Sequence, residues 1–92
     1  MKELSIQTKI VTYLRKTYPK AVVWKLADEK ISGIPDILFM NDGVAYFFEV
    51  KTPVGRLTKI QEYTIKALRR AGIYANKVTS LEEVKEILCS TN

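Results

Sequence analysis

The stretch GIPDILFMNDGVAYFFEVK, residues 33–51, decides how this chain folds. Two apolar, β-prone runs, DILFM and VAYFFEVK, lie on either side of Asn41, Asp42 and Gly43, and Asp-Gly between such runs is typical of a tight hairpin turn. Charged residues stand at both ends of this stretch: Asp36 at one, Glu49 and Lys51 at the other. Charges in so apolar a segment are costly unless they are paired or bind a metal. The hairpin therefore raises the question of what these three residues do.

The register of the hairpin predicts where the charges lie. A two-residue type I′ turn at Asp42-Gly43 places Asp36 directly opposite Glu49. Opposed residues on antiparallel strands have Cβ atoms about 4.5–5.5 Å apart, so the two carboxylates would repel each other. Lys51 falls on the same face because side chains alternate along a strand. This arrangement suits a divalent ion between the acids, and oxygen ligands favour Mg²⁺ or Mn²⁺.

Simpler structural roles for the three charged residues stay open. Asp36 can be a turn residue after Gly-Ile-Pro, while Glu49 and Lys51 can form a solvent-facing pair at a strand end. A three-residue turn would also shift the register by one and remove the opposition of the acids. The functional interpretation rests on all three residues lying on one face with the acids in register.

Composition limits the possible classes of protein. Ninety-two residues, 47% of them hydrophobic and 27% charged, indicate one globular domain, 1–92. Runs such as VAYFF are too short to span a bilayer, and MKELSIQTK at the start lacks the apolar core of a signal peptide. One cysteine and no histidine exclude an internal disulfide framework and ordinary zinc or histidine catalysis. We expect a cytoplasmic protein whose catalysis, if any, uses carboxylates, lysine or hydroxyls with a hard metal.

The charge balance favours an anionic partner. Fifteen basic residues against ten acidic ones give a net charge of +5 and a pI near 9.4, in the range typical of nucleic-acid-binding domains. Residues 51–77 are strongly basic and contain Glu62 as their one acid. A solvated helix face would have the same composition, so charge alone does not decide the function.

Periodicity and capping signals predict the element order α-β-β-β-α-β-α. A first helix runs to Tyr18-Pro19, a strand follows at 21–27, and the hairpin supplies the next two strands. Both faces of the hairpin are apolar, so helices should cover both sides of the sheet. The fold class is therefore α/β, with a mixed central sheet flanked by helices.

The second half of the chain contains clear helix boundaries. A capping box, Thr58 to Gln61, opens a helix that ends at Gly72, and residues 73–78 form a short strand. A second capping box, Ser80 to Glu83, opens the last helix.

Several motifs together resemble a known family. Pro35-Asp36, twelve further residues and Glu49-Val50-Lys51 are similar to the signature of the PD-(D/E)XK nuclease superfamily. GIPD (33–36), EVKTPVGRLTKIQ (49–61) and RRAG (69–72) resemble the VRR-NUC family of that superfamily, in its stand-alone viral and bacterial form. The resemblance covers nearly the whole chain and implies a restriction-endonuclease-like αβββαβ(α) core.

The resemblance also implies roles for the charged residues of the hairpin. Asp36 and Glu49 would bind the metal, with the Val50 carbonyl completing the site from the backbone. Lys51 would orient or activate the attacking water and stabilise negative charge on the phosphate.

The resemblance implies roles at two further positions, and the match at the second, Glu3, is looser. Gln61 would lie near the catalytic face, although its place in the capping box explains it equally well. Glu3, with Gln7 one turn later, would assist metal binding through water, and a purely structural role for Glu3 is equally open.

The implied activity is Mg²⁺- or Mn²⁺-dependent, structure-selective hydrolysis of DNA, with resolution of four-way (Holliday) junctions by a homodimer and no membrane partner. The implied location is the cytoplasm of a bacterium or a virus-infected host cell. Two alternatives stay open: a non-catalytic nucleic-acid-binding module of the same fold, and a protein-interaction domain with a basic face. Seven basic residues are expected to contact phosphates: Lys25, Lys30, Arg56, Lys59, Lys66, Arg69 and Arg70.

Overall fold

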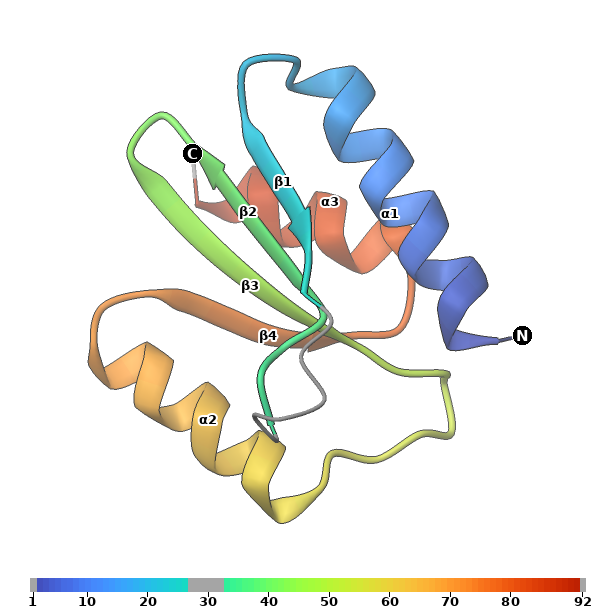
Figure 1. Ribbon diagram of the computed structural model, residues 1–92, viewed down its shortest axis with the longest axis vertical. Coiled ribbons are helices and arrows are strands. Elements are labelled where there is room, and N and C mark those ends of the chain that lie inside the picture. The colour runs from blue at the N-terminus through green and yellow to red at the C-terminus, as the bar shows by residue number, and fades with distance from the viewer. Residues whose placement is uncertain (1, 27–32, 92) are drawn as a thin grey trace.

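The computed structural model describes residues 2–26 and 33–91 and confirms the predicted element order (Figure 1). No helix in these two ranges is long and apolar enough to cross a membrane. The elements are α1 (Glu3–Thr17), β1 (Val22–Lys25), β2 (Ile37–Asn41), β3 (Val44–Val50), α2 (Lys59–Arg70), β4 (Tyr74–Val78) and α3 (Leu81–Ser90).

The four strands form one mixed sheet in the order β1-β2-β3-β4. The first three strands are antiparallel neighbours, whereas β4 runs parallel to β3 after the crossover through α2. The predicted α/β class with a mixed central sheet is confirmed.

The turn between β2 and β3 has the predicted geometry. Asp42 and Gly43 both have positive φ, at 50° and 77°, as a type I′ turn requires. Asn41 pairs with Val44, and the ladder continues to Ile37 opposite Phe48. One more step along this register brings Asp36 opposite Glu49, as the sequence predicted.

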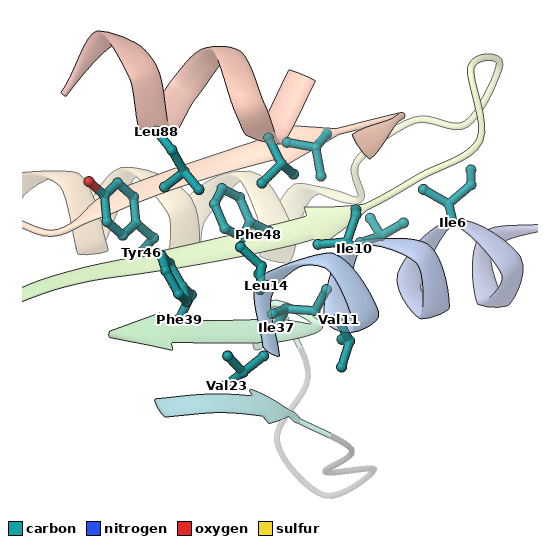
Figure 2. Packing of buried hydrophobic residues seen from close by; sticks show 13 residues of the cluster. Ile6, Ile10, Val11, Leu14, Val23, Ile37, Phe39, Tyr46, Phe48 and Leu88 are labelled. Atoms are coloured by element: carbon teal, nitrogen blue, oxygen red, sulfur yellow. The ribbon is translucent and has the colours of Figure 1, made fainter. Parts of the chain in front are cut away.

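One face of the sheet packs on α1 and α3 and forms the hydrophobic core (Figure 2). From the hairpin, Ile37, Phe39, Tyr46 and Phe48 point into this core, and each is at most 5% exposed. Val50 continues the same alternation and is fully buried. The helices supply the rest of the core from their inward stripes: Ile6, Ile10, Val11 and Leu14 from α1, Val84 and Leu88 from α3.

The opposite face is covered less completely than the sequence predicted. α2 lies against β4, and in the described part of the chain no helix lies over β1 and β2 on this side. A row of side chains crosses this face through Trp24, Leu38, Phe47 and Ala75, which are register partners on successive strands. Trp24, at the open end of the row, is 54% exposed. The expectation that helices cover both sides is therefore correct only near β4, because a single helix is too narrow to cover four strands.

The boundaries of α2 follow the capping signals. Thr58 and Gln61 form the complete capping box, with the Thr58 side chain accepting from the Gln61 N–H and the Gln61 side chain from the Thr58 N–H. At the other end Gly72 has φ +87°, and Ile73 N donates to Leu68 O at 3.0 Å, which closes a Schellman motif.

The second capping box forms only in part. The Ser80 side chain accepts from the Glu83 N–H at 3.2 Å, as predicted. The Glu83 carboxylate, however, accepts hydrogen bonds from the N–H and hydroxyl of Thr79 instead of returning to Ser80. The hydrogen bond from the Thr79 hydroxyl is the main cause that lowers the pKa of Glu83.

Candidate active site

Asp36 is fixed by hydrogen bonds from both neighbouring strands. Its carbonyl oxygen accepts from Leu26 N at 2.7 Å, which extends the β1–β2 ladder by one residue. Its side-chain Oδ2 accepts from Val50 N at 2.8 Å. The carboxylate therefore caps the ladder where β2 and β3 begin to separate, and its position is set by backbone groups.

Glu49 is the most unusual ionisable group of the described chain. It is 3% exposed and is the one buried charged residue in these ranges. Burial is the first cause that raises its pKa to about 8, followed by the negative charge of Asp36 and a hydrogen bond to that side chain. The positive charge of Lys51 opposes this shift without cancelling it. Without a metal, Glu49 thus holds a proton near neutral pH, which relieves the repulsion between the two opposed acids.

Two side chains contact the same oxygen of Glu49. Lys51 Nζ lies 3.8 Å from Glu49 Oε2, and Gln61 Nε2 donates to Oε2 at 3.4 Å. Gln61 also accepts from Thr58 N at 2.9 Å through its Oε1. Gln61 therefore caps α2, and the same amide ties the first turn of α2 to Glu49; its part in catalysis stays a prediction.

The loop before Asp36 packs directly on α2. Gly33 has φ +87°, and a Cβ there would lie 2.9 Å from Thr64 Oγ1 and 3.0 Å from the Ile60 carbonyl oxygen. Only glycine fits this close approach with this backbone conformation. Gly33 thus fixes the distance between the strand that carries Asp36 and the helix that carries Gln61.

The amino-terminal residues lie near the site without joining it directly. Glu3 is exposed at the start of α1, yet its negative charge contributes to the raised pKa of Glu49. Gln7 is half-buried one turn later. Across residues 2–26 and 33–91, no three His, Cys, Asp or Glu side chains lie close enough together to hold a metal. The role of Glu3 through water stays a prediction.

The oxygen groups at the site nevertheless fit a hard divalent cation. The Asp36 and Glu49 carboxylates are opposed in an apolar sheet, so their charges require a cation or a shared proton. The Val50 side chain points into the core, so this residue offers the site only its backbone.

Lys77 lies beside the site and was missed by the sequence interpretation. It is the register partner of Glu49 on β4 and is exposed, and its Nζ donates to Gly55 O at 3.5 Å. Parallel strands are joined by long crossovers, so no local turn indicates which residue of β4 meets Glu49. Its position in a basic segment was the available signal, and that signal did not distinguish it from its neighbours.

The basic residues predicted to contact phosphates differ in their exposure and in the hydrogen bonds that they already make. Lys30 lies outside the described residues, whereas Lys25, Arg56, Lys59, Lys66 and Arg70 are exposed. Arg69 is exposed too, but its Nε donates to Ala75 O at 2.8 Å and its Nη2 to Asn76 Oδ1 at 3.0 Å. Its guanidinium thus covers the edge of β4, and a phosphate would have to use its remaining donors.

A solved structure described as a VRR_NUC domain is similar to this chain, with a TM-score of 0.73 and 27% sequence identity, over 94% of this chain and 92% of the other. No family model matches the sequence, and no curated protein is similar to it. The structural match confirms the predicted resemblance and the restriction-endonuclease-like core, and it supports a nuclease-type fold.

Proposed function

We propose that this chain, a domain with the VRR-NUC fold, is a divalent-metal-dependent deoxyribonuclease. The observation that carries the proposal is Glu49, an acid only 3% exposed that lies opposite Asp36 and has its pKa raised to about 8. Burying a carboxyl beside a second one costs stability, and such perturbed groups concentrate at functional sites. A metal site explains why the chain keeps both acids.

Asp36, Glu49 and the Val50 carbonyl would hold Mg²⁺ or Mn²⁺ through oxygen atoms. When bound, the ion lowers the pKa of a water and neutralises negative charge on the phosphate. The chain's own contribution is to fix these oxygens. The Val50 N–H holds the Asp36 carboxylate, and Gln61 holds Glu49 Oε2 from the first turn of α2.

Lys51 supplies a positive charge at the reacting centre. Its side chain is 12% exposed and its Nζ is 3.8 Å from Glu49 Oε2, so it is held close to the acids in a partly water-excluded position. A fixed cation there orients the attacking water and stabilises the negative charge that develops on the phosphate.

The preferred substrate we propose is branched DNA, cut by a homodimer. The exposed basic residues around the site would contact phosphates, which position DNA without reading its sequence. Paired cuts in a four-way junction need two active sites related by a two-fold axis, and a chain of 92 residues with one such site supplies them by dimerising.

The test is a cleavage assay on end-labelled four-way junction, flap, nicked and linear DNA, in Mg²⁺, Mn²⁺ or EDTA. We expect cleavage only with metal, and we expect Asp36→Asn, Glu49→Gln and Lys51→Ala each to lower the rate about 1,000-fold, since metal catalysis contributes several kcal/mol. Asp42→Asn and Glu62→Gln are matched controls, because both are exposed acids outside the site, and they should cleave normally.

Each alternative has its own outcome in this assay. Undiminished cleavage by all three site variants would overturn the nuclease assignment. DNA binding without cleavage by the unmodified protein would favour a nucleic-acid-binding module, and no binding would favour a protein-interaction domain. Light scattering at micromolar concentration tests the dimer, and a monomer that cuts linear and junction DNA equally fast would leave a simple metal-dependent nuclease.

A further inference from the structure

The outer face of α2 carries a basic stripe with an aromatic residue within it. Lys59, Tyr63, Lys66 and Arg70 follow one another at intervals of four, three and four residues, so they share one face of the helix. All four are exposed, and Tyr63 is 66% exposed. The opposite face of the helix carries the buried Ile65. We call these four residues the α2 stripe.

Tyr63 differs from the other tyrosines of the chain. Tyr13, Tyr18, Tyr46 and Tyr74 each pack against another aromatic ring, at centroid distances of 5.1–6.5 Å. Tyr63 has no ring partner in the described part of the chain. Its ring therefore contributes little to the core, although it lies between basic residues on both sides.

The α2 stripe begins beside the candidate active site. Gln61, in the first turn of α2, bonds to Glu49, and Lys59 lies in the same turn but about 200° round the helix, on its outer side. From Lys59 to Arg70 the helix rises about 16 Å, or about five nucleotide steps at 3.4 Å per step along a strand. A strand that leaves the site and passes round the first turn of α2 can therefore follow the whole stripe.

We propose that the α2 stripe binds a DNA strand with unpaired bases, and that Tyr63 stacks on one of these bases. This inference rests on the proposed nuclease function and names the feature of the substrate that the site selects. Lys59, Lys66 and Arg70 match the phosphates by charge, and the tyrosine ring matches the face of any base. A continuous duplex keeps its base faces stacked inside the helix and offers Tyr63 nothing equivalent, so the stripe favours DNA with a single-stranded part.

The test is fluorescence anisotropy in EDTA, which prevents metal-dependent cleavage, with a 20-nucleotide single strand, a 20-base-pair duplex and the same duplex with a single-stranded flap. Tyr63→Ala should weaken binding of the single strand and the flap about 5- to 150-fold, the range expected for one stacked base, and change duplex binding less than about two-fold. Tyr63→Phe should bind like the unmodified protein because it keeps the ring. Tyr74→Ala, which removes an exposed tyrosine on β4, is the matched control and should leave the preference unchanged.

The charged members of the stripe should behave differently. Lys66→Ala should weaken all three DNAs by a similar factor and reduce the slope of log affinity against log salt by about 0.7–0.9, the value for one phosphate contact. Circular dichroism and thermal melting confirm that each variant is folded.

Failure of this inference is distinct from failure of the proposed function. Suppose that the unmodified protein binds and cleaves DNA, but Tyr63→Ala weakens the binding of duplex and single strand equally or weakens the binding of neither. Then Tyr63 does not stack on a base, and the nuclease assignment stands. If the unmodified protein binds none of the three DNAs, both proposals are overturned.

Discussion

Phe48 and Glu49 are neighbours on β3, point to opposite faces of the sheet, and are almost equally buried, at 0% and 3% exposed. Phe48 lies among the core side chains of α1 and α3, where burial of apolar surface stabilises the fold. Glu49 lies opposite Asp36 on the other face of the sheet, the one that packs against α2, which we call the α2 face. Burial there raises the pKa of Glu49 and costs stability. Equal exposure thus has opposite energetic consequences, and the face on which a residue lies decides which applies.

The same contrast holds across the two faces as a whole. The face that forms the core is closed by two helices. The α2 face has apolar side chains at Trp24, Leu38 and Phe47, and two residues beyond Leu38 and Phe47 it has the acids Asp36 and Glu49. There Lys51 and Gln61 contact Glu49, and the loop at Gly33 packs on α2. The candidate site is therefore assembled from polar groups at the end of a sheet face that no helix of the described chain covers fully.

The largest expected effect on stability comes from the core side of this comparison. Phe48→Ala should lower the free energy of unfolding by about 3–5 kcal/mol, because it removes a fully buried ring and leaves a cavity. Urea denaturation followed by circular dichroism measures the change. Glu49→Gln is the matched variant on the opposite face and should not destabilise the metal-free protein. An equal loss in both variants would show that the two faces do not differ as described.

The second largest expected effect is a pH dependence of stability that comes from Glu49 on the α2 face. The pKa of Glu49 rises from 4.5 in the unfolded chain to about 8 in the folded one, so the folded chain binds more protons between these values. This contribution to stability is full below pH 4.5 and is lost as pH rises through about 8, by up to a few kcal/mol. Thermal melting in EDTA should therefore show the unmodified protein losing stability from pH 5 to 8 relative to Glu49→Gln. Mg²⁺ should restore stability at pH 8, and parallel curves for the two proteins would contradict the assignment.

A glycine pair tests how the α2 face is positioned. Gly33 and Gly72 both have φ +87°, but only at Gly33 would a Cβ meet other atoms. Gly72→Ala should cost about 1–2 kcal/mol from backbone strain alone, and Gly33→Ala should cost more and also slow DNA cleavage. Denaturation and cleavage rates measured on both variants make the comparison. Equal activity in the two variants would mean that the Gly33 contact with α2 does not position the site.

The smallest expected effect compares two helix caps. Thr58→Ala and Ser80→Ala should each cost about 1 kcal/mol, because each removes one cap of a helix amino terminus. Only Thr58→Ala should also slow cleavage, since the Thr58 hydroxyl accepts from the Gln61 N–H and so fixes the backbone from which the Gln61 side chain contacts Glu49. If Ser80→Ala slows cleavage as much, the effect comes from general loosening of the fold.

Much of this arrangement could be predicted from local sequence signals. The Asp42-Gly43 turn, the alternation along DILFM and VAYFFEVK, and the Thr58 capping box are each encoded within a few residues. They were sufficient to predict the element order and the opposition of Asp36 and Glu49, and the structure agrees with both. The metal, the substrate and the dimer stay predictions that the experiments above address.

The sequence by itself determined the hairpin, because a two-residue turn fixes the register of every pair that follows it. Only the tertiary structure decided that Lys77 lies beside Glu49, that α2 packs on the sheet at β4, and that Gln61 both caps a helix and contacts the buried acid. These features depend on how a parallel strand and a helix dock after a long crossover. Docking of that kind is set by the packing of distant residues, for which neighbouring residues in the sequence give no signal.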